Sequence, residues 1–234
     1  MLYQTHVRVH LNNIRSNIEN IRKAIGPERK ILIAVKADGY GHGAVEVSKM
    51  AEKIGVDWLG VATVPEAIEL RLAGINLPIL KFSPCFPEEM TEAVNHRLAI
   101  AVCETNNVLL LNEAARCCNR VTEVHLKIDT GMGRIGVQID QAKELAGRII
   151  KDCPFLKLTG AMTHLPVSDE ASKTFTQRQI DRFKKAVKEI EQTHNFKFEL
   201  VHCANSGGIL GHPESWLDMV RPGIMLYGFY PSDE

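Results

Sequence analysis

Residues 31–43 read ILIAVKADGYGHG, and this stretch says most about the fold. The apolar run Ile31–Val35 is typical of a buried strand. Lys36 follows at once, and three glycines stand among the next seven residues, which lets backbone approach a ligand closely. The lysine is either a surface charge on an apolar stem or a desolvated amine suited to Schiff-base chemistry.

Similar apolar runs recur along the chain and alternate with stretches of helical spacing. The predicted strands are Ile31–Val35, Trp58–Thr63, Pro78–Phe82, Ala99–Val102, Val121–Ile128, Leu156–Thr163, Phe198–His202 and Leu217–Val220. The predicted helices are Ala44–Ile54, Pro65–Ala73, Pro87–Asn95, Asn106–Cys118, Ile139–Ile150 and Lys173–Thr193, with a helical turn around Ser206–Gly211. An amphipathic helix over Leu11–Ile25 precedes them, with Asn12 or Asn13 near its start and Gly26-Pro27 closing it.

Eight strand signals separated by helices indicate parallel βαβ units. Eight such units in a chain of 234 residues match the usual size of a (β/α)8 TIM-type barrel. A doubly wound open sheet gives similar patterning. The strand count and the extra N-terminal helix, placed to act as an eighth outer helix, favour the barrel. We therefore expect residues 1–234 to form one α/β domain.

Composition narrows the function classes. Basic and acidic residues number 28 each, so no net field favours nucleic acid, and a charged ligand needs a local cluster of side chains. No apolar run of about 18 residues suggests a membrane span, and the N-terminus lacks a leader pattern. The six cysteines form no CxxC pair and no zinc-binding pattern, so we expect no metal site. They are interpreted as free thiols in a reducing compartment, and we expect a cytoplasmic protein.

Polar residues gather where several predicted strands end, and a barrel would bring these ends to one face. The clusters are residues 36–43, 127–134, 163–164, 202–208 and 221–223. Ser206-Gly207-Gly208 and Arg221-Pro222-Gly223 come at the end of the barrel where phosphate is often bound. Taken alone, a loop arginine such as Arg134 is usually solvated, and histidines that flank strands are usually core residues.

Several segments closely resemble those of alanine racemases, in the same order and approximate spacing. They are AVKADGYGHG (34–43), HLKIDTGMGRIG (125–136), TH (163–164), HCANSGG (202–208) and VRPGIMLYG (220–228), and the resemblance spans about residues 5 to 230. It implies a barrel that binds pyridoxal 5'-phosphate (PLP), a small amino-acid substrate, and interconversion of L- and D-alanine for peptidoglycan.

The resemblance also implies roles for individual residues. Lys36 would hold PLP covalently and act as a base, and Arg221 would face the pyridine nitrogen, with His164 holding Arg221 in place. Arg134 would bond the phenolic oxygen of PLP and assist the substrate carboxylate, oriented by Lys127 if that lysine is carbamylated. The other implied cofactor-binding residues are Tyr40, Asn205, Ser206, Gly223, Ile224 and Tyr227.

Racemisation needs two acid/base groups, one on each face of the α-carbon. In alanine racemases the second is a tyrosine of a C-terminal β-rich domain, contributed across a homodimer interface. None of Tyr3, Tyr40, Tyr227 and Tyr230 matches it, and the chain stops about where that domain would begin. We therefore expect residues 1–234 alone to be poorly active, whether they are a piece of a longer protein or a natural single domain.

Three alternatives stay open at this point. A stand-alone PLP-binding barrel of cofactor homeostasis would have similar length, although its motifs differ. Another activity of the same fold type, an aldolase or dehydratase on D-amino acids, usually adds metal ligands in a second domain. A racemase that prefers serine is the third, because residues 81–84 and 165–167 depart from many alanine racemases near the site.

Overall fold

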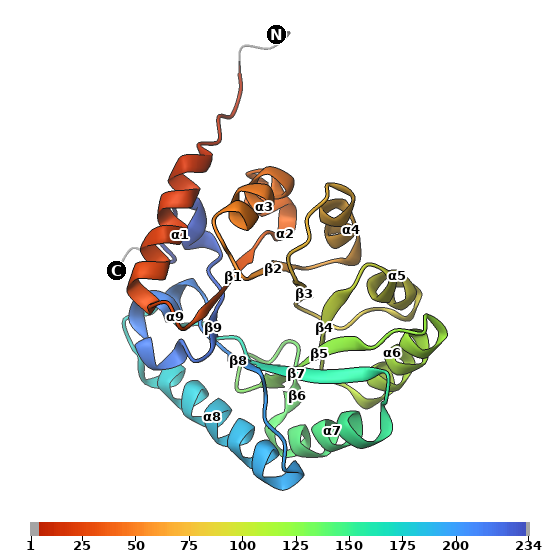
Figure 1. Cartoon of the computed structure of the whole chain (residues 1–234). Coiled ribbons are helices and arrows are strands. Elements are labelled where there is room, and N and C mark those ends of the chain that lie inside the picture. The colour runs from red at the N-terminus through yellow and green to blue at the C-terminus, as the bar shows by residue number, and fades with distance from the viewer. Residues whose placement is uncertain (1–4, 233–234) are drawn as a thin grey trace.

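Eight parallel strands follow one another around a barrel in the computed structural model, which describes residues 5–232 (Figure 1). Their order is β8-β7-β5-β4-β3-β2-β1-β9. The strands are β1 (Lys30–Ala34), β2 (Trp58–Val61), β3 (Ile79–Lys81), β4 (Leu98–Val102), β5 (Thr122–Asp129), β7 (Leu156–Met162), β8 (Leu200–His202) and β9 (Met219–Val220). All eight predicted strands are thus present and parallel.

Helices cover the outside of the barrel, as Figure 1 shows. They are α1 (Leu11–Ile25), α2 (Lys36–Gly41), α3 (Ala44–Lys53), α4 (Val64–Leu72), α5 (Met90–Asn95), α6 (Thr105–Cys117), α7 (Ile139–Asp152), α8 (Thr174–His194) and α9 (Ser206–Gly211), with 3₁₀ turns η1 (Pro87–Glu89), η2 (Pro213–Ser215) and η3 (Ile224–Tyr227). The predicted helices are confirmed to within a few residues. Among the described helices, none has both the length and the apolar composition to cross a membrane.

The pairing of the first strand with the last excludes the open-sheet alternative. Ile31 of β1 lies in register with Val220 of β9. On its other side β9 meets β8 through two main-chain bonds, Asp218 N to Val201 O at 3.1 Å and Arg221 N to Ala204 O at 2.8 Å. Helix α1 packs against α3 and η3, beside this seam, and so takes the place of the missing eighth outer helix.

Two apolar layers form because strand side chains alternate between the two faces of the sheet. One layer fills the space between strands and helices and includes Ile31, Ile33, Leu59 and Phe183. The other fills the barrel interior and consists of Leu32, Trp58, Leu80, Ala99, Ala101, Met162, Leu200 and Met219. The interior of the barrel is therefore a packed core, and a mouth lies at the carboxyl ends of its strands.

Five strands are shorter than predicted, namely β2, β3, β7, β8 and β9. Local reasons account for β3, β8 and β9. Phe198 N donates to Glu191 Oε1 and so takes no part in the sheet, whereas Glu199 N donates to Thr159 O of β7 just before β8 begins at Leu200. Pro78 has no N–H to donate, so β3 begins at Ile79. Leu217 has a positive φ of 45°, which delays β9 until Met219.

Helix α1 ends as predicted but begins differently. Gly26 closes it with φ 86°, a conformation that suits glycine. The N-cap is His10, which makes no side-chain capping bond, and Asn12 and Asn13 lie inside the helix.

The loop from Asp129 to Gly136 carries one predicted site residue, Arg134, and the structure adds a two-residue strand to it, β6 (Val137–Gln138). This strand pairs with the end of β5, so the loop folds back on itself. The Asp129 carboxylate accepts bonds from the N–H groups of Gly131, Met132 and Gly133. Gly136 lies so close to Asp129 that a Cβ atom there would stand 2.6 Å from Asp129 N.

Gly136→Ala is therefore expected to destabilise the protein by at least about 2 kcal/mol, because overlap with backbone costs about 1–3 kcal/mol and adds to the positive φ of 154°. Gly133→Ala is the matched control in the same loop. It also has positive φ, but nothing lies within 4 Å of its added Cβ, so about 1 kcal/mol is expected. Urea unfolding followed by circular dichroism compares the two, and equal midpoints would contradict the steric argument.

Candidate active site

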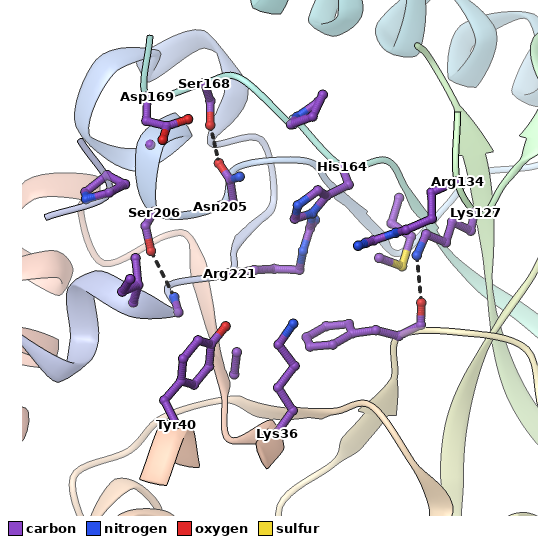
Figure 2. A pocket seen from close by; sticks show the side chains of 18 residues that line it. Lys36, Tyr40, Lys127, Arg134, His164, Ser168, Asp169, Asn205, Ser206 and Arg221 are labelled. Atoms are coloured by element: carbon purple, nitrogen blue, oxygen red, sulfur yellow. Dashed lines mark hydrogen bonds between the residues drawn. The ribbon is translucent and has the colours of Figure 1, made fainter. Parts of the chain in front are cut away.

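A cavity of about 330 Å³ opens at the carboxyl ends of the strands, the face on which barrel enzymes carry their active sites. It collects every site residue predicted from the sequence except Tyr227. The lining residues are Ala34, Lys36, Tyr40, Phe82, Lys127, Arg134, Met162, His164, Pro166, Ser168, Asp169, Asn205, Ser206, Gly207, Arg221, Gly223, Ile224 and Pro231. Figure 2 shows Lys36 between Tyr40 and Ser206 on one side and Lys127 and Arg134 on the other.

Lys36 enters the cavity at the start of a left-handed turn. The four residues Ala37 to Tyr40 all have φ between 50° and 60° and ψ between 38° and 52°. Only glycine adopts this conformation freely, and other residues cost about 1–2 kcal/mol each. Such strain persists where the surroundings over-determine it, which is common at functional sites. The turn brings both Lys36 and Tyr40 into the cavity wall.

Two carboxylates hold this turn. Glu66, at the start of α4, accepts from Ala37 N at 2.7 Å, while its other oxygen accepts from Ala62 N and Thr63 N. Asp38 accepts from Ala44 N at 2.7 Å and so links the turn to α3. The strained backbone is thus anchored through its first two residues, Ala37 and Asp38.

Tyr227 supports the same turn from behind and lies outside the cavity lining, contrary to its expected place among the cofactor-binding residues. Its hydroxyl donates to Ala34 O at 2.8 Å. Its ring lies 5.1 Å from the ring of Tyr40 and 4.7 Å from that of His42. The buried hydroxyl of Tyr227 already has an acceptor, so Tyr227 has a structural role although it follows a glycine-containing motif.

The amine of Lys36 has no hydrogen-bond or ion-pair partner within residues 5–232. Its nearest recorded contact is the ring of Tyr40, 5.8 Å from the Nζ atom. The Tyr40 hydroxyl and the side chains of Arg134 and His164 likewise form no hydrogen bond with the described part of the chain. Four side chains with hydrogen-bonding groups therefore face the cavity with that capacity unused, as Figure 2 shows.

Basic side chains dominate the electrostatics of the cavity. Lys36, Lys127, Arg134 and Arg221 line it, whereas Asp169 is the one acidic residue among its lining residues. This is the local cluster that a chain with no net charge needs for an anionic ligand.

Two lining residues have lowered pKa values in this field. Burial, reinforced by Arg221 and Arg134, lowers the pKa of Lys127 to about 8. Burial and the same two arginines lower the pKa of His164 to about 3, so His164 is neutral at physiological pH. Lys127 Nζ donates to Phe82 O at 2.8 Å.

Arg221 lies fully inside the barrel mouth. Its Nη2 donates to Thr163 O at 2.7 Å and to Cys203 O at 3.2 Å, and its Nη1 meets Nδ1 of His202 at 2.9 Å. Burial lowers the pKa of Arg221 to about 10, which leaves it charged at neutral pH. The bonded partner is thus His202, and the expected role of His164 as that partner is wrong. The reason is position, because His202 points into the barrel from β8 whereas His164 follows β7 and lines the cavity.

Ser206 and Gly223 form the end of the cavity near Tyr40. Ser206 Oγ accepts from Gly223 N at 3.1 Å and from Met225 N at 3.3 Å, so its own hydroxyl proton is left to donate. A Cβ atom at Gly223 would stand 2.9 Å from the Tyr40 hydroxyl, so only glycine keeps this end open.

Asn205 has a structural position beside them. Its Oδ1 caps α9 by accepting from Gly208 N, and it also accepts from Ser168 Oγ. Its amide donates to Leu165 O at 2.8 Å. Phe82 and Pro166 lie in the segments 81–84 and 165–167 that the sequence places near the site, whereas sequence reasoning missed Ala34, Met162, Ser168, Asp169 and Pro231 as lining residues. Proximity to predicted strand ends is the one signal that points to some of them.

Comparison with known proteins identifies the family. The family model described as "Alanine racemase, N-terminal domain" matches residues 9–231. The chain is 41% identical to an alanine racemase of Desulforamulus reducens over 97% of the chain and 61% of the relative. It is 44% identical to an alanine racemase of Cutibacterium acnes over 97% of the chain and 60% of the relative.

Solved structures agree with these relatives. The alanine racemase of Clostridium difficile 630 in complex with cycloserine superposes with a TM-score of 0.95 at 37% identity, over 100% of this chain and 64% of that one. The alanine racemase of Bacillus anthracis with bound L-Ala-P gives a TM-score of 0.88 at 32% identity, over 96% of this chain and 58% of that one. The chain spans about three fifths of the length of the curated relatives it matches. By its sequence, its barrel and the residues gathered at the barrel mouth, the chain belongs to the alanine racemase N-terminal domain family.

Proposed function

We propose that this chain is the PLP-binding barrel of an enzyme that interconverts L- and D-alanine. The observation that carries the proposal is the unpartnered amine of Lys36, held by a strained turn inside a cavity lined by four cations. PLP and an amino acid together bring a phosphate and a carboxylate, so a cationic cavity suits them. The relatives named alanine racemase support alanine as the substrate.

The residues at one end of the cavity fit a phosphate. The Tyr40 hydroxyl and the Ser206 hydroxyl have protons to donate there, and Gly223 leaves room that a side chain would fill. The backbone at Gly223 and Ile224 completes this end. We therefore assign Tyr40, Ser206, Gly223 and Ile224 to the phosphate of PLP, as the resemblance implies.

PLP, when bound, supplies an electron-withdrawing ring that stabilises negative charge at the α-carbon of an amino acid. Arg221 is proposed to face the ring nitrogen. An arginine is a permanent donor, so it cannot accept a proton and hand it to that nitrogen, and its charge disfavours protonation there. Arg221 would therefore moderate how strongly the ring withdraws electrons.

Arg134 and Lys127 are proposed to orient the substrate carboxylate and the phenolic oxygen of PLP. A guanidinium suits this task because it binds a carboxylate through two parallel bonds. Carbamylation of Lys127 needs the neutral amine, and a pKa of about 8 leaves roughly a tenth of Lys127 neutral at pH 7. The modification would also require Lys127 to release Phe82 O, and its negative charge would then hold Arg134.

Lys36 Nζ is proposed to take the α-proton on one face of the substrate. The other face needs a second acid/base group, and His164 is a poor proton donor there because its pKa of about 3 leaves it unprotonated. Tyr3, one of the four tyrosines, lies outside the described residues. We propose that a part of the full-length protein beyond this chain supplies the group within a homodimer, as the resemblance implies.

Alanine is proposed as the substrate in preference to serine. The protein is proposed to be cytoplasmic, and its D-alanine product to be used for peptidoglycan. The unusual segment 81–84 is mostly committed to itself, since the buried Lys81 Nζ donates to Ser83 Oγ at 3.1 Å and to Pro84 O at 2.8 Å. The segment 165–167 reaches the cavity through Pro166, a side chain without hydrogen-bonding groups that offers nothing to a serine hydroxyl.

Reduction with borohydride tests the cofactor site. After incubation with PLP, peptide mapping should place the reduced adduct on Lys36, and Lys36→Ala should carry none. Lys127→Met is the matched control, because Lys127 is also in the cavity but its amine already donates to Phe82 O. It should keep the adduct on Lys36, and an adduct on any other lysine of the native protein would overturn the assignment.

A polypeptide of residues 1–234 loaded with PLP should racemise alanine poorly. Loss of one general acid–base group typically costs about 10²–10⁴-fold, so turnover should fall by at least that range relative to a form extended through the next domain. Exchange of the α-proton with deuterated solvent should persist for one enantiomer, because that step needs only Lys36. Equal racemisation by both forms would show that residues 1–234 contain the second group.

A further inference from the structure

A chain of three buried side chains runs from the floor of the cavity into the barrel interior. Arg221 Nη1 meets His202 Nδ1 at 2.9 Å, and His202 Nε2 meets His125 Nδ1 at 2.9 Å. Both histidines have no exposed surface, and 5% of Arg221 is exposed. His125 comes from the middle of β5 and does not reach the cavity, so the function proposed above gives it no task.

The hydrogen atoms of this chain can be placed by elimination. A guanidinium only donates, so His202 Nδ1 must be the acceptor and carry no proton. Burial and the charge of Arg221 lower the pKa of His202 well below its usual value, so the ring is neutral and its proton sits on Nε2. His202 therefore has one possible tautomer as long as Arg221 donates to it.

The same reasoning fixes the second ring. His202 Nε2 donates, so His125 Nδ1 accepts and the proton of His125 sits on Nε2. Burial followed by the charge of Arg221 lowers the pKa of His125 to about 3, so this ring is neutral as well. Within the described residues, His125 Nε2 has no partner although it is buried. An unsatisfied buried donor is costly and calls for an explanation.

The barrel is built around the His125 ring. A Cβ atom at Gly160 of β7 would stand 2.5 Å from Cγ and Nδ1 of His125, so a glycine makes the space. The pairing of β5 with β7 is irregular between Val124 and His125. On another side Trp58 packs against the ring, with centroids 5.5 Å apart. The position of the ring is thus set by packing, independently of Arg221.

We propose that His125 is a positioning residue for Arg221. Because packing holds its Nδ1 beside His202 Nε2, His125 accepts from that N–H and favours the His202 tautomer that offers Nδ1 to Arg221. Arg221 is thereby fixed as a donor at the cavity floor, and each N–H that links the three side chains points away from the cavity. No proton can pass along these bonds toward the ring nitrogen of PLP. The last consequence rests on the proposed function, whereas the order of donors and acceptors does not.

Nitrogen-15 spectra of the histidine rings test the order directly in the cofactor-free protein. Two-bond couplings distinguish which ring nitrogen carries the proton, and the His125 and His202 signals are assigned by their loss in variants. Both rings should be neutral with the proton on Nε2. A proton on Nδ1 of His202 would overturn the proposal, and this measurement on the native protein needs no variant to fold and no PLP.

Two replacements of nearly equal size separate positioning from packing. In His125→Asn, Oδ1 stands where Nδ1 stood and can still accept from His202. In His125→Leu, a methyl group stands there. Leucine suits a buried site better than asparagine, so packing alone predicts that the leucine variant is at least as stable and at least as native-like.

The proposal predicts the opposite order for PLP. His125→Asn should keep the single His202 tautomer, the native visible spectrum of bound PLP and nearly native affinity. His125→Leu should lose the single tautomer, alter the spectrum and weaken PLP binding by about tenfold or more, as expected when a bond to a charged group is lost. Equal spectra and affinities in the two variants would overturn the proposal. Failure of the native protein to bind PLP would instead refute the proposed function and leave the ring spectra as the test.

Discussion

Closure of the sheet between β1 and β9 is the constraint on which the site depends. Ala34 N donates to Pro222 O at 3.0 Å at this seam, although the two residues are far apart in the chain. The closure sets the lysine that follows β1 beside the arginine that follows β9. It also brings Tyr40 against Gly223, which forms the phosphate-sized end of the cavity. An open sheet with the same strands would leave these two motifs on opposite edges.

The positive charge inside the barrel mouth explains why the histidines near it are neutral. Four cations share one cavity, and the polar groups around them are arranged so that none adds a further positive charge. His164, His202 and His125 all have lowered pKa values, first because they are buried and then because Arg221 is near. The cavity therefore keeps its positive charge for ligands and has neutral rings to support it.

Backbone strain at the site is held in place by groups outside it. The left-handed turn from Ala37 to Tyr40 is fixed by Glu66, by Asp38 and by the ring of Tyr227. Glu66 also closes the capping box of α4 with Thr63, so the helix and the turn share one carboxylate. The position of Lys36 thus depends on the second βα unit as well as on its own.

The sequence by itself determined the eight strands, the helices and most of the residues at the mouth, because these follow from periodicity and from the order of strand ends. It also made Lys36 conspicuous, since an apolar run and three glycines surround it. Only the tertiary structure decided which side chains touch. His202 and His125 are 77 residues apart and meet because β5 and β8 flank β7. Neither the choice of His202 over His164 as the partner of Arg221, nor the removal of Tyr227 from the cavity, follows from spacing along the chain. Both depend on where each side chain points once the barrel has closed.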